Sequence, residues 1–224
     1  GITPDLKRQL RVSQWKSEFT EHEINSPLEL ISENFFHPTK RISITSIPTR
    51  EQDVIAMFNQ LIAGGVIRGI NIMSTNERFV YDGMYRAIIA PPKENHIFDA
   101  ILNPLGVRKE YYAEYENFTS EPKILEYKLC LNGLIEDFED GSKNSNDIDL
   151  AVVWETGKDY EGNYEILSYL NEDNLSERTY HGLTHRMKNM TTGQSEMELI
   201  VLKELVDYLN DRESAIAFQE EKYG

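Results

Sequence analysis

Apolar residues recur along the chain with two different periods, and the changes between them predict where helices and strands lie. Beyond residue 48, segments typical of helices alternate with segments typical of strands. The expected elements are, in order, a helix over 50–63, strands over 66–74 and 79–90, an insertion over 91–122 with one short strand at 98–102, a strand over 123–130, a helix over 131–140, strands over 147–155 and 163–170, and a terminal helix over 195–211 whose beginning could equally be a strand. Strands interleaved with helices predict an α/β domain around a mixed sheet, which we place at residues 49–224.

The helix over 50–63 has the clearest pattern of all. Thr49 and Gln52 are spaced as a capping box at its start, and Gly64 follows its end. Glu51 lies one turn before the apolar stripe, where an acid also suits the helix dipole. The residues expected to form the buried stripe are Ile55, Phe58 and Ile62.

Residues 1–48 are expected to form a helical appendage or linker. A helical spacing covers 5–19, and a second short helix is expected to begin with Ser26 as its N-cap and Pro27 at its first position. The chain begins with glycine rather than methionine. We therefore expect it to be a fragment of a longer protein.

Composition narrows the class of protein. The chain has 224 residues, of which 40% are hydrophobic and 27% charged, as in a globular protein. No apolar run approaches the roughly 20 residues that cross a bilayer. A single cysteine, Cys130, excludes an internal disulfide and leads us to expect a cytoplasmic protein. The net charge of −15 disfavours unaided binding to nucleic acid, because such binding depends on Lys and Arg neutralising phosphates.

Four charged residues interrupt the apolar segments. Glu51 lies on the helix over 50–63, Asp82 in the second strand, and Glu126 and Lys128 in the strand over 123–130. Glu126 and Lys128 are two apart, so both side chains point to one face of a strand. Carboxylates gathered at one place need a cation, and oxygen ligands without His or Cys favour Mg²⁺ or Mn²⁺. This pattern predicts metal-assisted hydrolysis of a phosphodiester.

The order of these residues resembles the core of the PD-(D/E)xK nuclease superfamily, which has the restriction-endonuclease-like fold. In that family a helix carries a Glu, a strand carries the Asp, the next strand carries (D/E)xK, and a helix and a strand follow. The resemblance covers residues 49–155. It implies a Mg²⁺- or Mn²⁺-dependent endonuclease in which Glu51, Asp82 and Glu126 hold the metal, while Asp82, Glu126 and Lys128 are catalytic.

A second resemblance concerns the setting of the domain. "REQDVIAMFNQLIAGGVIRG", followed by "YDGMYR" and "IDLAVVWE", is similar to a nuclease-like C-terminal region of some bacterial proteins with a GHKL-type ATPase domain. This setting would fit a fragment of a longer protein. The charge of −15 implies that the nucleic acid, which we expect to be DNA, is held by something outside this chain or by a local basic patch. The sequence departs from the superfamily pattern in three ways: no proline precedes Asp82, the insertion before "EYK" is long, and the chain is acidic.

Two alternatives to a metal-dependent nuclease remain open. Asp82 can be a turn residue before Gly83, with Glu126 and Lys128 a solvent-facing pair. The domain can also be a catalytically inactive nuclease fold that serves protein interaction or homodimerisation, since its insertion contains the tyrosine-rich stretch "EYYAEYENF".

Other candidates are weaker. His181 and His185 have a spacing that chelates zinc on a helix, but we favour structural roles for both. Asp149 and Glu155 are minor candidates for joining the acidic site. A local basic patch that would help to bind nucleic acid comprises Arg68, Arg78 and Arg86.

Overall fold

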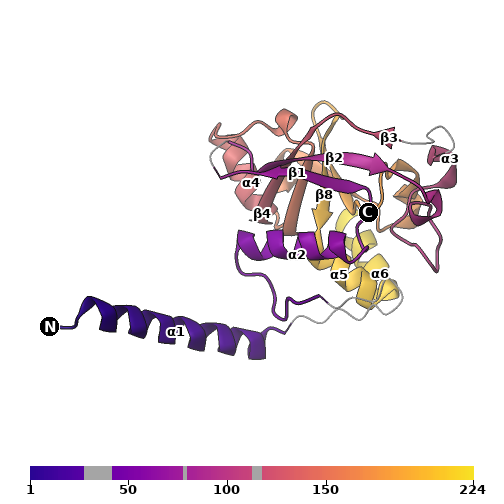
Figure 1. The fold of residues 1–224 in the computed structure, drawn as a ribbon. Coiled ribbons are helices and arrows are strands. Elements are labelled where there is room, and N and C mark those ends of the chain that lie inside the picture. Colours follow the sequence, from indigo (N-terminus) through magenta and orange to yellow (C-terminus); the bar gives the residue numbers. More distant parts are fainter. Residues whose placement is uncertain (28–41, 78–79, 113–117) are drawn as a thin grey trace.

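The computed structural model describes residues 1–27, 42–77, 80–112 and 118–224. Within these ranges the chain forms an α/β fold with eight strands in one mixed, open sheet and helices on both faces (Figure 1). The helices are α1 (Pro4–Asn25), α2 (Glu51–Ala63), α3 (Lys109–Tyr112), α4 (Leu131–Glu139), α5 (Leu202–Asn210) and α6 (Arg212–Tyr223). The strands are β1 (Ile70–Thr75), β2 (Gly83–Ile89), β3 (Phe118–Thr119), β4 (Lys123–Cys130), β5 (Leu150–Glu155), β6 (Tyr164–Ser168), β7 (His185–Asn189) and β8 (Ser195–Val201).

The sheet has a parallel centre and antiparallel flanks. Its strand order is β1-β2-β4-β5-β8-β7-β6, and β3 pairs with β2 beside this path. β4, β5 and β8 run parallel to one another, whereas β1 with β2, β2 with β4, β8 with β7 and β7 with β6 are antiparallel. The chain direction therefore reverses between β2 and β4, next to Asp82 and Glu126.

Both faces of the central strands are buried. On β5, Leu150 and Val152 belong to the apolar core that includes residues of α2 and α5. Ala151 and Val153 alternate with them and join a second core that includes residues of α4. A strand covered on both sides is expected to be continuously apolar, and "LAVVW" has that composition.

The helix expected over 50–63 is confirmed as α2, but its N-terminal cap differs from the predicted one. Its N-cap is Arg50 rather than Thr49, and the N3 residue of the capping box is Asp53 rather than Gln52. The Asp53 carboxylate accepts hydrogen bonds from the backbone N–H groups of Thr49 (3.0 Å) and Arg50 (3.1 Å). The box is thus shifted by one residue, because a carboxylate three residues after Arg50 satisfies two free backbone donors.

The buried face of α2 is rotated from the predicted stripe. Ile55 and Ile62 are only half-buried. The residues of α2 with no exposed surface are Val54, Met57, Phe58 and Leu61.

Several expected strands change their bounds. β1 begins at Ile70, after Gly69 turns the chain with a positive φ of 87°. β2 begins at Gly83, so Asp82 immediately precedes the strand instead of lying within it. The prediction of a short strand at 98–102 is wrong. Those residues form tight turns, with one isolated bridge between Asp99 and Asn103.

The C-terminal third contains elements that the sequence pattern did not predict. β7 covers "HRMKN", and α6 follows α5 after a break at Asp211. The ambiguous start of the segment over 195–211 is a strand, β8, and α5 begins only at Leu202.

The N-terminal segment forms one long helix, which extends away from the rest of the molecule in Figure 1. Leu6 and Leu10, which belong to the helical spacing over 5–19, are 45% and 55% exposed. The second helix expected near residue 26 falls mostly outside the described residues. Ser26 caps the C-terminal end of α1, and Pro27 forms an isolated bridge with Ser46. In the described parts of the chain, no helix is long and apolar enough to cross a membrane.

Candidate functional site

Two carboxylates meet where β2 runs alongside β4. The antiparallel register pairs Gly83 with Leu125 and so brings Asp82 next to Glu126, 44 positions later in the chain. The Asp82 N–H donates to Glu126 Oε2 (3.3 Å), and the Tyr127 N–H donates to Asp82 Oδ2 (2.8 Å). Two of the four predicted site residues are therefore in direct contact.

The backbone around Asp82 is held closely in place. The Asp82 carbonyl accepts a hydrogen bond from the Asn76 N–H (2.7 Å), which closes the connection between β1 and β2. A Cβ atom on Gly83 would lie 2.6 Å from the Ser74 carbonyl oxygen, closer than real Cβ atoms approach backbone. Glycine after the aspartate is thus a steric requirement of this hairpin.

Glu126 lies in an environment that disfavours its charge. Leu125 and Tyr127 point into the core shared with α2, so Glu126 points to the other face, beside Ala151 of β5. Its residue surface is 0% exposed. Burial raises the pKa of the Glu126 carboxyl to about 7; the charge of Asp82 adds to this shift, and Lys143 opposes it. The interpretation of Glu126 as a solvent-facing residue is therefore wrong.

Two lysines and a further acid complete the charged group. Lys128 Nζ lies 2.8 Å from Asp137 Oδ2 on α4. Lys143, from the loop after α4, forms an ion pair with Glu126 Oε1 and lies 3.5 Å from the same Asp137 oxygen. Asp137 thereby connects the two ammonium groups.

Glu51 approaches from the other side of the sheet, at the first position of α2. Burial raises its pKa, and the charge of Asp82 raises it further, whereas Lys128 and Lys143 lower it. These influences place Glu51 in the electrostatic neighbourhood of the site, although α2 and α4 pack on different faces. We call the full set the charged cluster; its members are Glu51, Asp82, Glu126, Lys128, Asp137 and Lys143.

The donor chemistry of the charged cluster suits a hard cation. Its possible ligands are carboxylate oxygens, which Mg²⁺ and Mn²⁺ prefer. Four carboxyl groups face two ammonium groups, which leaves an excess of two negative charges when all are ionised. As the described side chains stand, no three His, Cys, Asp or Glu residues are close enough together to hold a metal ion.

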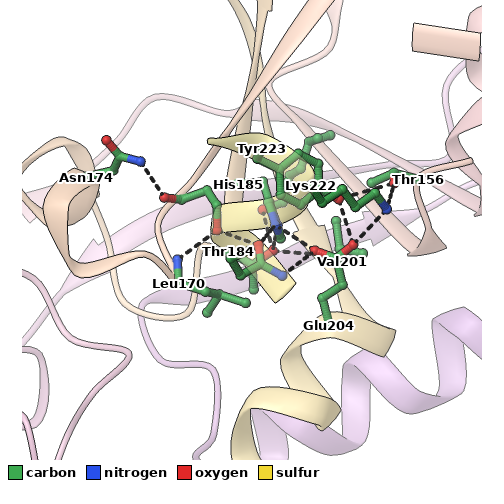
Figure 2. A network of polar contacts seen from close by, with 12 residues as sticks. Thr156, Leu170, Asn174, Thr184, His185, Val201, Glu204, Lys222 and Tyr223 are labelled. Atoms are coloured by element: carbon green, nitrogen blue, oxygen red, sulfur yellow. Dashed lines mark hydrogen bonds and ion pairs between the residues drawn. The ribbon is translucent and has the colours of Figure 1, made fainter. Parts of the chain in front are cut away.

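The two histidines have separate structural partners. His181 Nδ1 accepts a hydrogen bond from the Arg68 N–H (3.2 Å), so its Nε2 donates to Asn103 Oδ1 (2.7 Å). Burial lowers the pKa of His181 well below its usual value. His185 lies instead in a buried polar network, 2.8 Å from Glu204 Oε2 (Figure 2).

The two minor acidic candidates lie elsewhere. Asp149 accepts a hydrogen bond from the Ile124 N–H (2.8 Å) at the beginning of β4. Glu155 is exposed and lies 3.8 Å from Lys203 Nζ. Asp149 immediately precedes β5 and Glu155 ends it, so the two acids lie at opposite ends of this strand and contact residues outside the charged cluster.

The arginines of the expected basic patch have backbone partners. Arg68 donates to the Asn95 carbonyl (2.8 Å), and Arg86 donates to the Ser120 carbonyl (3.3 Å). Both acceptors belong to the insertion between β2 and β4, which these bonds hold against the sheet. Arg78 lies outside the described residues.

Sequence reasoning missed Asp137 and Lys143. Asp137 lies in an acidic helix, "LIEDFED", where one acid among four carries no distinguishing signal. Lys143 lies in the polar loop "GSKNSN", without the apolar surroundings that drew attention to Lys128. Only the packing of α4 and its following loop against β4 identifies them.

Comparisons with protein-family models, with curated proteins and with solved structures found no match to this chain. Any function inferred for this chain therefore depends on the charged cluster itself.

Proposed function

We propose that this chain is a divalent-metal-dependent nuclease domain with a restriction-endonuclease-like core, related to the PD-(D/E)xK superfamily, which hydrolyses phosphodiester bonds of DNA. The observation that carries the proposal is the contact between Asp82 and Glu126 on adjacent strands, with Lys128 on the same face two residues later. The order α2, β2, β4, α4 and β5 supports the proposal; Asp82 immediately precedes β2, and α3 and β3 lie between β2 and β4.

The electrostatics of the charged cluster support a bound Mg²⁺ or Mn²⁺. Glu126 is fully buried beside Asp82, and two adjacent carboxylates do not both stay ionised without a cation. The excess of two negative charges in the cluster matches one divalent ion. Asp82 and Glu126 would hold the ion, with Glu51 supplying a third carboxylate. When bound, such an ion lowers the pKa of a water ligand and stabilises charge on a phosphoryl oxygen.

The remaining residues orient and position the reacting groups. Lys128 places an ammonium group beside the carboxylates, where it can orient the attacking water and offset the charge that develops on the phosphate. Asp137 fixes the position of that ammonium group through its 2.8 Å ion pair. Asp137 is thus a positioning residue rather than a catalytic one.

DNA binding is proposed to need help from outside this chain. A net charge of −15 opposes the approach of a polyanion, and the two described arginines of the expected patch hold the insertion instead. We infer that another domain or subunit supplies most of the contacts with the phosphates.

The experiment compares the parent chain with Asp82→Asn and Lys128→Ala on supercoiled DNA in Mg²⁺ and in Mn²⁺, and titrates each protein with Mn²⁺. We expect the parent to bind Mn²⁺ and to nick the DNA. Asp82→Asn should lose both activities, because it loses a ligand, whereas Lys128→Ala should lose cleavage and keep Mn²⁺ binding. Removing one catalytic group of this kind typically lowers the rate by about 10²–10⁴-fold.

The matched control is Asp149→Asn. It removes one carboxylate from the same sheet, at a position bonded to the backbone of Ile124 rather than to the charged cluster. This variant should cleave and bind Mn²⁺ like the parent.

An inactive interaction module is the competing interpretation, and one observation favours it. Glu126 is already neutralised by Lys143 without any metal. Failure of the parent both to bind Mn²⁺ and to cut DNA would select this alternative. Mn²⁺ binding without cleavage would instead indicate that the DNA-binding partner is required.

A further inference from the structure

Lys143 occupies an unusual position for a loop lysine. Its ammonium group forms an ion pair with Oε1 of Glu126, a residue with no exposed surface, and its own side chain is only 13% exposed. The contact lies on the carboxylate that we propose as a metal ligand. A protein cation therefore stands where a metal cation would bind.

We propose that Lys143 is a built-in counter-cation of the metal-free site, which leaves Glu126 for Asp137 when a divalent ion binds. This inference rests on the proposed function. It goes beyond that function by assigning a role in metal loading to a residue outside the "EYK" motif and by predicting how that residue moves.

Asp137 provides a second partner for the Lys143 ammonium group. Lys143 Nζ is 3.5 Å from Asp137 Oδ2 while it contacts Glu126. The ammonium group can therefore transfer from one carboxylate to the other without becoming unpaired, which matters because an unpaired buried charge is strongly destabilising. Lys128 already contacts the same Asp137 oxygen at 2.8 Å, so the exchange would leave both ammonium groups on one carboxylate.

The surroundings leave room for this movement. Lys143 also lines an open pocket on the α4 side, next to the side chains of Tyr81, Phe138 and Tyr164. The loop that carries Lys143 also contributes four other lining residues, which are Gly141, Ser142, Asn144 and Ser145. The lysine side chain therefore borders open space on one side and the charged cluster on the other.

The test measures Mn²⁺ affinity at pH 8 in the parent, Lys143→Gln and Lys123→Gln. Removing the ammonium group from Glu126 removes a charge that competes directly with the metal. We expect Lys143→Gln to bind Mn²⁺ at least about tenfold more tightly than the parent. Lys123→Gln makes the same change in net charge on β4, the strand of Glu126, where Lys123 Nζ lies 3.9 Å from Asp149 Oδ1, and it should bind Mn²⁺ like the parent.

A second measurement needs no variant. Amine labelling of the parent, read by mass spectrometry, should change at Lys143 when Mg²⁺ is added and remain constant at Lys123. This measurement keeps the proposal testable if Lys143→Gln does not fold.

The outcomes separate the two proposals. Equal or weaker Mn²⁺ binding by Lys143→Gln, or labelling of Lys143 that ignores Mg²⁺, overturns the counter-cation role and leaves the nuclease proposal intact. If none of the three proteins binds Mn²⁺, the proposed function fails, and the role of Lys143 in metal loading fails with it.

Discussion

At the scale of single residues, Asp82 is held in position by hydrogen bonds to three other residues. Its N–H, its carbonyl and its carboxylate each have a backbone or side-chain partner, contributed by Glu126, Asn76 and Tyr127. Gly83 allows this arrangement, because β1 passes too close for a side chain there. A small change beside Asp82 should therefore disturb the site without touching a charged group.

Gly83→Ala tests this dependence. The added methyl group would meet the Ser74 carbonyl oxygen at 2.6 Å, so the β1–β2 hairpin must shift. We expect a loss of about 1–3 kcal/mol in the free energy of unfolding, measured by urea denaturation, together with weaker Mn²⁺ binding. Gly162→Ala is the matched control, because a Cβ there meets nothing within 4 Å. A Gly83→Ala protein as stable as that control would contradict the steric argument.

At the scale of elements, a buried polar network joins the two C-terminal helices to the sheet (Figure 2). Glu204 on α5 accepts hydrogen bonds from Gln219 (2.9 Å) and Tyr223 (2.6 Å) of α6. It also lies 3.1 Å from Lys222 Nζ and 2.8 Å from His185 Nε2 on β7. Glu204 therefore connects three elements, α5, α6 and β7.

Glu204→Gln tests the network through its pH dependence. Burial alone would raise the pKa of Glu204, but the charge of His185 and the hydrogen bonds from His185, Tyr223 and Gln219 outweigh burial and lower it from its ordinary 4.5. A lowered carboxyl pKa contributes stability above about pH 4.5, and this contribution is lost as the pH falls toward the pKa of the folded state.

We therefore expect Glu204→Gln to lose about 3 kcal/mol at pH 7. The difference from the parent should shrink as the pH falls below 4.5, as measured by denaturation at a series of pH values. Glu213→Gln, an exposed change in the first turn of α6, should show neither effect. A difference that stays constant from pH 7 to pH 3 would show that Glu204 does not act through its charge.

At the scale of the whole molecule, the core and the charged cluster both lie beyond residue 48. Leu6, Leu10 and Val12 of α1 are exposed, whereas α2, α4 and α5 supply buried residues to the two faces of the sheet. Near the C-terminal end of α1, His22 Nε2 donates a hydrogen bond to the Ile47 carbonyl (2.8 Å). The division at residue 48 remains a prediction, and the exposure of α1 makes it testable.

Deletion of residues 1–25 tests this division. Because α1 buries little surface, we expect the melting temperature to change by less than about 2 °C, as measured by calorimetry. Deletion of 212–224, which removes the α6 half of the Glu204 network, should lower it much more. A large loss on removing α1 would show that the helix is part of the folded core.

The sequence by itself determined which residues carry charge and which face of a strand they share. The alternation of "ILEYKLC" places Glu126 and Lys128 on one side of β4, because neighbouring side chains of any strand point to opposite faces. The apolar run "LAVVW" likewise predicts a strand buried on both sides. These conclusions follow from local periodicity, which needs no knowledge of the rest of the fold.

Only the tertiary structure decided which distant residues meet. Asp82 contacts Glu126 because β2 pairs with β4 in one register, and a shift of one residue would turn every side chain of the strand to the other face. Asp137 and Lys143 join the site because α4 packs beside β4 and its loop returns across Glu126. The strand β7 was missed because its polar residues are stabilised by cross-strand partners such as Glu198, 3.1 Å from Arg186, rather than by a local pattern. Contacts of this kind arise between segments far apart in the chain, where periodicity carries no information about distance.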